Sequence, residues 1–191
     1  MSGLISRNTV NALWIAWLLY WFLGALRVRR NERGESLSQR LRTTLVLAAG
    51  AYLIFAPVTP LGPLNARFVP DAMGTRGVAL AVLVVGLSIT VWARRHIGQF
   101  WSARVMLKEG HELIQTGPYA RVRHPIYSGI FLAMLGTALF VGEWRALLGT
   151  AVFFVGHWAK ARREESLLAS QFGPTYEDYR QRTGSLLPRL R

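Results

Sequence analysis

Cysteine is absent from this chain of 191 residues. The absence excludes disulfide bonds, structural zinc sites built on thiolates and a cysteine nucleophile. Histidine is scarce as well, and the four histidines are scattered without the H-E-x-x-H spacing of a metalloprotease. They are His96, His111, His124 and His157. The sequence therefore predicts no metal site.

Glycine-rich nucleotide-binding motifs are also missing. The chain has neither a phosphate-binding loop nor the fingerprint of a dinucleotide-binding βαβ unit. Any nucleotide-like cofactor would have to be held without those devices. Internal repeats and low-complexity tracts are absent too, and the length suits one domain. We therefore expect a single domain over residues 1–191.

Acidic residues are few: 10 Asp and Glu stand against 23 Lys and Arg, which gives a net charge of +13. Hydrophobic residues, in contrast, make up 51% of the chain, which is high for a soluble protein. Uncharged apolar blocks cover residues 10–26, 45–64 and 77–93. Each approaches the roughly 20 residues that a helix needs to cross a bilayer. These blocks predict membrane-spanning helices.

Two further apolar blocks, 126–142 and 146–159, are separated by only three residues. So short a connection predicts an antiparallel helical hairpin, in which the second helix continues as an amphipathic extension. Helices buried in a soluble core are the alternative reading of all five blocks. That reading is disfavoured, because five such helices would leave too little polar surface to cover them.

The basic residues are distributed unevenly along the chain. With the N-terminus outside and five crossings, the inner segments are 27–44, 94–125 and 160–191, which hold six, six and seven of the 23 Lys and Arg. This positive-inside pattern predicts an N-out, C-in topology. It explains the charge better than a nucleic-acid partner does. The basic loops also suit contact with anionic lipid headgroups.

Polar functional groups concentrate in the second half of the chain. Residues 1–93 are expected to form a three-helix membrane scaffold, whose first helix is an uncleaved anchor because its basic cluster follows the apolar run. Pro57, Pro60 and Pro63 are expected to end or bend the second helix. Residues 94–191 form the candidate catalytic half. In it, residues 94–110 mix basic and aromatic side chains, as an interfacial segment does.

The segment HELIQTGPYARVRHPIYSG, residues 111–129, places polar side chains directly before an apolar helix. Such groups are costly to hold near hydrocarbon unless they serve a function. Pro125 is suited to be the first residue of the fourth helix, with His124 at its cap. A cap histidine in water is the alternative for that residue.

On the fifth helix, His157, Lys160 and Glu164 have helical spacing and share one face, whereas Glu165 points away from it. The plain alternative is an exposed Lys160–Glu164 ion pair worth a few tenths of a kcal/mol. After Pro174 we expect a short helix followed by an extended tail.

The segments combine into a recognisable pattern. It reads H-x-L-[VI]-x-x-G-x-Y-x-x-x-R-H-P-x-Y, followed about 35 residues later by E-E-x-x-L-x-x-x-F-G-x-x-Y-x-x-Y. This pattern resembles the isoprenylcysteine carboxyl methyltransferase family of integral membrane enzymes, which use S-adenosylmethionine. The resemblance covers roughly residues 94–188, while the first three helices match only in type and number. It implies an all-α fold with five transmembrane helices. A cytoplasmic-side cofactor pocket is implied between the loop before the fourth helix, the fifth helix and the C-terminal helix.

The resemblance also implies roles for individual residues. The cofactor-binding positions would be His111, Glu112, Leu113, Ile114, Gly117, Tyr119, His124, Pro125, Ile126, Tyr127 and Glu164. His124, Arg123 and Glu164 are the candidate catalytic residues. Lys160 and Arg104 are candidate substrate-binding residues, and they depart from the family, which has an arginine and a glutamine at these positions. Both departures concern the substrate more than the cofactor.

These expectations amount to methyl transfer from S-adenosylmethionine to a lipophilic acceptor at the membrane interface. A prenylcysteine-like or other isoprenoid carboxylate would need positioning but no general base. An amine or thiol would need one, and His124 or His157 would supply it. The alternatives are a phosphatidylethanolamine N-methyltransferase and a non-catalytic lipid-binding protein. Membrane lipids are the expected partners, with no nucleic acid and no required protein partner. The protein would be multi-pass, with its cofactor site on the cytoplasmic side, in the inner membrane if the chain is bacterial.

Overall fold

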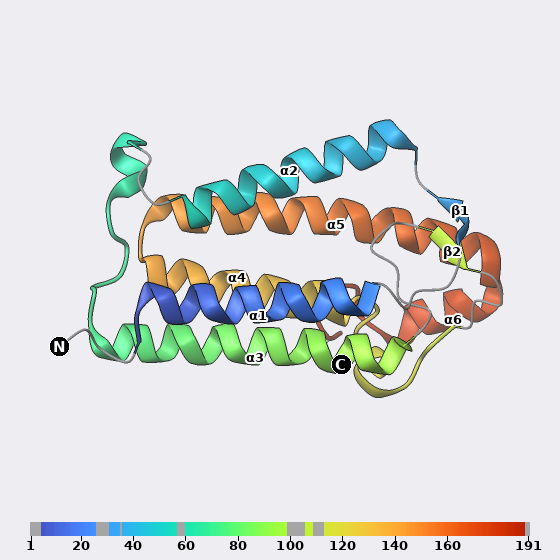
Figure 1. The fold of residues 1–191 in the computed structure, drawn as a ribbon. Helices are drawn as coiled ribbons and strands as arrows, with labels where there is room; N and C mark the ends of the chain where they lie inside the picture. Colours follow the sequence, from blue (N-terminus) through green and yellow to red (C-terminus); the bar gives the residue numbers. More distant parts are fainter. Residues whose placement is uncertain are drawn as a thin grey trace.

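The computed structural model describes residues 5–25, 31–34, 36–56, 60–98, 106–108 and 113–189. Five long helices lie nearly side by side, and a short sixth helix packs at one end of the bundle (Figure 1). The elements are α1 (Arg7–Ala25), β1 (Asn31–Gly34), α2 (Leu37–Phe55), η1 (Gly62–Asn65), α3 (Met73–Ile97), β2 (Met106–Lys108), η3 (Gly117–Ala120), α4 (Pro125–Val141), α5 (Trp144–Phe172) and α6 (Pro174–Arg182). The expected five helices, the hairpin of α4 and α5 and the short helix after Pro174 are confirmed. The antiparallel pair of β1 and β2 was not expected in an all-α chain.

The boundaries of α2 differ most from the sequence prediction. The apolar block 45–64 suggested a helix there, but α2 begins at Leu37 and ends at Phe55. Ser36 and Gln39 form a capping box, in which each side chain binds the other residue's backbone N–H. The capping box therefore starts α2 in a polar stretch, eight residues before the apolar block from which hydropathy alone would begin the helix. Of residues 94–110, predicted to lie on the membrane surface, the structure describes 94–98 at the end of α3 and the strand β2, while 99–105 and 109–110 lie outside the described residues, so this placement stays a prediction.

Helices α3 and α4 approach each other backbone to backbone. A Cβ atom added at Gly86 on α3 would lie 2.4 Å from the backbone nitrogen of Ala133 on α4. A second close contact joins α2 and α5, where a Cβ atom at Gly149 would lie 2.6 Å from the Gly50 carbonyl oxygen. Small residues at helix crossings are typical of membrane bundles, in which packing replaces the hydrophobic effect. These two pairs form the frame of the fold.

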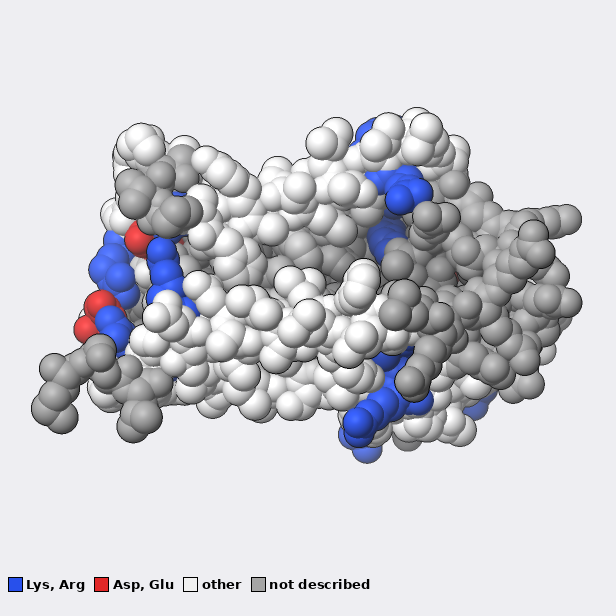
Figure 2. Space-filling model, in the orientation of Figure 1, with Lys and Arg blue, Asp and Glu red and all other residues white. Residues whose placement is uncertain are grey.

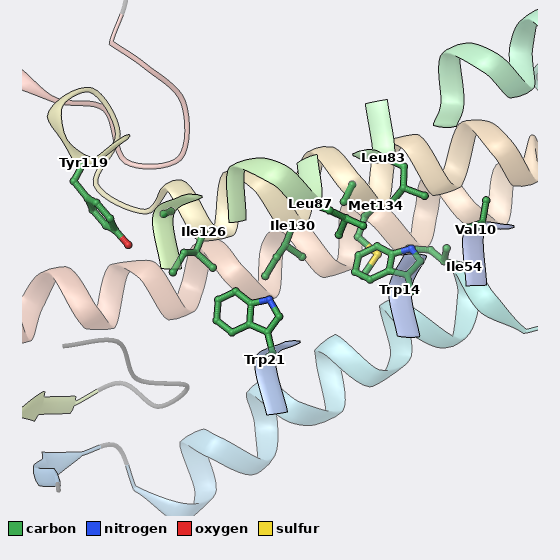
Figure 3. Close-up of a cluster of buried hydrophobic side chains, with 12 residues drawn as sticks. Val10, Trp14, Trp21, Ile54, Leu83, Leu87, Tyr119, Ile126, Ile130 and Met134 are labelled. Carbon is green, nitrogen blue, oxygen red and sulfur yellow. The ribbon is translucent and has the colours of Figure 1, made fainter. Parts of the chain in front are cut away.

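Helix α1 adds an aromatic face to this frame. The Trp14 indole donates to the Thr137 hydroxyl at 3.0 Å, and the Trp17 indole donates to Thr90 at 2.6 Å. These bonds satisfy ring N–H groups that burial would otherwise leave without a partner. Figure 3 shows the apolar cluster that α1 covers, which also draws on α2, α3 and α4. Its labelled members are Val10, Trp14, Trp21, Ile54, Leu83, Leu87, Tyr119, Ile126, Ile130 and Met134.

The outer surface of the bundle is strongly apolar. Large hydrophobic side chains are exposed on four of the long helices, among them Leu18, Phe22, Leu45, Val78, Trp92, Val155 and Trp158. On the face shown in Figure 2, charged residues gather toward the two ends of the helices and the middle is free of them. A surface of this kind needs an apolar environment. The described part of the chain therefore has the polarity pattern of a membrane protein.

Length and composition single out α3 as the one described helix that is long and apolar enough to cross a membrane, while α4 is apolar but shorter. The other three carry polar residues within their length: α1 has Asn8 and Asn11, α2 has Arg40 and Arg42 in its first two turns, and the second half of α5 is charged. The five expected crossings and their orientation therefore stay predictions. The five helices themselves are present.

The end of the bundle that holds the α4–α5 turn is fixed by one buried cation. Arg145 is only 1% exposed, and its guanidinium donates to the carbonyl oxygens of Leu53 and Ala56 at the end of α2. It also pairs with Glu143 at 2.6 Å. Since helix C-terminal carbonyls have no partner within the helix, Arg145 caps α2 and joins it to the α4–α5 turn.

Candidate active site

The start of α4 places the first polar group of the site. Pro125 is the first residue of the helix and His124 is its N-cap, as predicted. The His124 side chain makes no capping bond, however, and the residue is only 7% exposed. The alternative of a cap histidine in water is therefore wrong. The imidazole turns into the protein instead.

His124 lies between two carboxylates of α5. Its Nδ1 atom is 3.4 Å from Glu164 Oε2, and its Nε2 atom is 3.2 Å from Glu165 Oε1. Ionised carboxylates only accept hydrogen bonds, so both ring nitrogens must donate and the ring is an imidazolium. Burial alone would lower the pKa of His124, but the bonds to Glu164 and Glu165 outweigh it and raise this pKa.

The two carboxylates are ionised in turn. Burial favours the neutral form of Glu164, but its hydrogen bond with His124 and the charge of Lys160 lower its pKa. For Glu165, burial is likewise outweighed, and hydrogen bonds from His124, Arg123 and Ser185 lower the pKa to about 2. The site therefore holds alternating charges that compensate one another.

Glu165 is the member of the site that helical spacing missed. It was expected to point away from the face of Glu164, yet it is 7% exposed and receives Arg123 Nε at 3.0 Å and Ser185 Oγ at 2.7 Å. Glu164 and Glu165 are adjacent on α5 and their side chains point in different directions. Both reach the same imidazole because His124 lies between them, with Nδ1 toward Glu164 and Nε2 toward Glu165. The sequence signal that could have pointed to Glu165 is the pair of consecutive glutamates, in a chain with only 10 acidic residues.

The extended tail after α6 closes one side of the site. Its backbone runs parallel to the segment before α4, and the backbone N–H groups of Arg123 and His124 donate to Gly184 and Ser185 at 2.9 and 3.0 Å. Arg123 Nη1 adds a bond to the Thr183 carbonyl at 2.6 Å. Arg123, predicted as catalytic, thus has donors directed at Glu165 and at this tail. Its catalytic role stays a prediction.

Tyr127 forms the centre of the site. Its hydroxyl donates to Glu164 Oε1 at 2.6 Å, and its ring stacks on His124 with a centroid distance of 5.5 Å. The Lys160 ammonium lies 5.5 Å from the centroid of the same ring, and the His157 ring meets it edge-on at 4.9 Å. The structure therefore brings together Tyr127, His124 and the predicted face of α5. Glu164 meets Tyr127 and His124, so the plain ion-pair reading does not describe its surroundings.

His157 differs from His124 in its hydrogen bonding. Its Nδ1 atom lies 3.1 Å from the carbonyl oxygen of Phe153, one turn earlier on α5. A carbonyl oxygen only accepts, so Nδ1 carries the proton and Nε2 has the free lone pair. The residue is 7% exposed, with the Phe153 ring 4.5 Å from its own.

The other predicted cofactor-binding residues that the structure describes lie in the segment before α4 and in its first turn. Tyr119 is buried, which raises the pKa of its hydroxyl, and its ring stacks on His96. Gly117 begins η3 with φ +58°, and a Cβ atom there would lie 2.6 Å from the His96 ring. Leu113 is partly buried, Ile114 packs on the apolar cluster, and Pro125 and Ile126 are buried at the start of α4. His111, Glu112 and Arg104 lie outside the described residues.

The residues present fit a cofactor that carries an ammonium group. The Glu164 side chain is 20% exposed, and each of its oxygens can accept a further hydrogen bond beyond those from Tyr127 and His124. The described residues contain no cluster of three or more histidine, aspartate or glutamate side chains that could hold a metal ion. The geometry thus provides a fixed, ionised carboxylate beside an aromatic ring.

Comparison with known proteins gives consistent results. The family model described as phospholipid methyltransferase matches residues 75–175. The chain is 36% identical to the protein-S-isoprenylcysteine O-methyltransferase of Schizosaccharomyces pombe over 113 residues, which are 58% of this chain and 48% of that protein. It is 42% identical to methanethiol S-methyltransferase 2 of Bradyrhizobium diazoefficiens over 74 residues, which are 38% of this chain and 27% of that one.

A solved structure shares the fold. The eukaryotic intramembrane Ras methyltransferase, an isoprenylcysteine carboxyl methyltransferase, superposes with a TM-score of 0.52 at 24% identity, covering 78% of this chain and 50% of that one. The chain spans about half the length of the curated relatives it matches. The resemblance predicted from the sequence motifs is confirmed by these similarities. Since the matched residues of the family model make up more than half of the chain, this protein belongs to the phospholipid methyltransferase family.

Proposed function

We propose that the protein is a membrane methyltransferase that uses S-adenosylmethionine and acts on a lipophilic acceptor. The observation that carries this proposal is the partly buried cluster of Glu164, His124 and Tyr127, which holds an ionised carboxylate where the start of α4 meets the second half of α5. The cofactor supplies an electrophilic methyl carbon on a sulfonium. The chain has to bind it, orient it and exclude water around it.

The residues divide this work between them. Glu164 would bind the ammonium of the methionine part, and the backbone near Leu113 and Ile114 would hold the adenosine. His124, as an imidazolium, keeps Glu164 ionised and fixed in orientation. Glu165 and Arg123 in turn fix His124 and the tail, so their part is positioning.

The acceptor we propose is a prenylcysteine-like or other isoprenoid carboxylate. Lys160 lies over the Tyr127 ring, one turn from Glu164, where its cation would hold an anionic head. A carboxylate is already nucleophilic, so its methylation needs no proton acceptor. The exposed apolar side chains of α1, α2 and α3 support a membrane setting in which the acceptor reaches the site from the lipid. The positive-inside pattern supports a cytoplasmic-side cofactor.

A phospholipid N-methyltransferase is the second candidate, favoured by the description of the matching family model. Its acceptor is an ethanolamine headgroup, which is cationic until it loses a proton. The Lys160 ammonium beside Tyr127 disfavours a cationic headgroup at this place. A lipid-binding protein without catalysis, the third possibility, need not bind the cofactor at all.

Cofactor binding tests the proposal. Isothermal titration of S-adenosylmethionine into the detergent-solubilised protein is expected to show binding that Glu164→Gln and His124→Ala each weaken at least tenfold. Glu177→Gln is the matched control, since Glu177 is an exposed carboxylate on α6 that pairs with Arg180. Undiminished binding in both site variants would reject the site. Labelled methyl transfer into a farnesylcysteine analogue or into phosphatidylethanolamine then separates the two enzymatic candidates.

A further inference from the structure

His96 is an exposed residue in the last turn of α3 that the proposed function leaves without a use. Its Nε2 atom lies 2.8 Å from the hydroxyl oxygen of Thr116, 20 positions later in the chain. Its ring stacks on Tyr119, with the centroids 6.3 Å apart and the planes inclined by 24°. Water could satisfy an exposed imidazole, so burial does not force these contacts. His96 therefore links a helix of the frame to the segment before α4.

The short helix η3 in that segment cannot fix its own position. It has four residues, and 3₁₀ turns of this length have poor hydrogen-bond geometry. Its N-cap residue, Thr116, makes no side-chain capping bond. A threonine hydroxyl at an N-cap usually accepts from the helix backbone, whereas this one binds His96. The position of η3 therefore depends on contacts with other elements.

Gly117 lets the imidazole of His96 lie directly against the backbone of η3. Its φ of +58° is a conformation that glycine adopts without strain. A Cβ atom at this position would lie 2.6 Å from Cε1 of the His96 ring, so the ring fills the space that a side chain would need. This close fit limits how far η3 can shift along α3.

Helix α6 holds the same segment through two further bonds. The buried Tyr179 hydroxyl donates to the carbonyl oxygen of Tyr119 at 2.7 Å. One turn later, Arg182 Nη2 donates to Gln115 Oε1 at 3.1 Å. Residues three apart share one face of a helix, so α6 presents both donors to the segment. Residues 115–119 are thus bound from α3 and from α6, through bonds that do not involve Glu164.

The segment 115–119 adjoins both proposed parts of the cofactor site. Leu113 and Ile114, whose backbone would hold the adenosine, directly precede it. At its other end, burial chiefly raises the pKa of the Tyr119 hydroxyl, and the charge of Glu164 adds to the rise. Glu164 therefore lies within electrostatic range of η3. A displacement of this segment would move the adenosine side of the site relative to the carboxylate.

We propose that His96 and Tyr179 are positioning residues for the adenosine part of the cofactor, which they hold in place through residues 115–119. The inference rests on the proposed use of S-adenosylmethionine, with the adenosine near Leu113 and Ile114. The methionine part is held separately, by Glu164 and the residues that fix it. A ligand that consists of the adenosine part alone should therefore depend on His96 and Tyr179 but not on Glu164.

5′-Methylthioadenosine is the probe, because it keeps the adenosine and a methylthio group but lacks the ammonium and carboxylate of the methionine part. Its binding to the detergent-solubilised protein is measured by isothermal titration beside that of S-adenosylmethionine. We expect His96→Ala to weaken both ligands by the same factor of about five, the usual effect of losing one neutral hydrogen bond. Tyr179→Phe should act in the same way, whereas Glu164→Gln should weaken S-adenosylmethionine alone.

A merely structural role of His96 gives a different result. If His96→Ala loosened the whole site, the contact with Glu164 would suffer too, and S-adenosylmethionine would lose more affinity than 5′-methylthioadenosine. That outcome would overturn the inference. Arg95→Ala is the matched control, since Arg95 is the exposed neighbour of His96 on α3, and it should bind both ligands as wild type does.

Two further variants test whether His96 acts through Thr116. In His96→Gln the amide reaches about as far as Nε2, so it can bind the Thr116 hydroxyl and should restore most of the affinity. Thr116→Val removes the other partner of the same bond. The variant with both His96→Ala and Thr116→Val should therefore lose less affinity than the product of the two single losses. Losses that simply multiply would contradict a role through this bond.

The outcomes separate this inference from the proposed function. If wild type fails to bind S-adenosylmethionine, the proposed function itself is wrong. If wild type binds it, but His96→Ala and Tyr179→Phe bind both ligands unchanged, only the inference is overturned. A wild type that binds S-adenosylmethionine but not 5′-methylthioadenosine overturns it as well, because the adenosine side would then not be a site of its own. Should His96→Ala fail to fold, Thr116→Val and Tyr179→Phe test the same segment.

Discussion

Glu165 Oε1 lies 3.2 Å from His124 Nε2, although Glu165 is on α5 and His124 is the N-cap of α4, 41 positions earlier in the chain. The same oxygen accepts from Arg123 and Ser185, so one carboxylate joins α5, the start of α4 and the tail. Three donors on one atom hold it in a single orientation. The neighbouring carboxylate, Glu164, contacts the other nitrogen of the same imidazole, so its position depends on this arrangement.

We predict that Glu165→Gln destabilises the protein by about 3 kcal/mol, because it leaves the Arg123 guanidinium buried without its counter-charge. Chemical unfolding in detergent measures this. The same substitution at Glu177, whose side chain is 46% exposed, should cost less than about 0.5 kcal/mol. Similar losses in both variants would mean that the buried pair contributes no more than a surface one.

Stability should depend on pH with two limbs. The pKa of His124 is raised above its ordinary 6.5, so its contribution is full below pH 6.5 and is lost as the pH rises through the raised value. The pKa of Glu165 is lowered from 4.5 to about 2, so its contribution is full above pH 4.5 and is lost as the pH falls toward 2. Thermal unfolding across this range should show greatest stability between pH 4.5 and 6.5. His124→Gln should remove the alkaline limb, and an unchanged limb in that variant would assign it to another group.

Tyr127→Phe should weaken S-adenosylmethionine binding about tenfold, the usual effect of losing one hydrogen bond to a charged group. The ring contacts with His124 and His157 would remain, so stability should change little. Titration calorimetry gives the affinity. Tyr52→Phe, on the exposed surface of α2, is the matched control. An affinity equal to that of the control would show that the hydroxyl does not orient Glu164.

Gly184→Val should detach the tail. A Cβ atom at Gly184 would lie 1.7 Å from the carbonyl oxygen of Leu187, and the Gly184 backbone cannot move away without breaking its bonds with Arg121 and Arg123. We expect loss of cofactor binding and faster proteolysis of the tail, with the five long helices retained in circular dichroism. Gly74→Val is the control, because no atom lies near a Cβ there. A tail that resists protease as well as wild type would contradict the proposed pairing.

The sequence predicted the long helices and the His124 N-cap well, because hydropathy and a proline at the first helical position are local signals. It misplaced α2, since the Ser36 capping box acts before the apolar run begins. It missed Glu165, because the position of that side chain depends on where α4 begins against α5. It could not place the tail, whose pairing with residues 121–124 joins segments about 60 positions apart.

The docking of the tail has a consequence for biogenesis. The residues from Thr183 to Leu186 bind the backbone of Arg123 and His124 and the hydroxyl of Ser128, yet the ribosome delivers them after all five long helices. Helix insertion and site assembly are therefore separate events in time. A nascent chain can have all five long helices in place while Glu165 still lacks its bond from Ser185, so the site is complete only after residues 183–186 have been synthesised and have paired with residues 121–124.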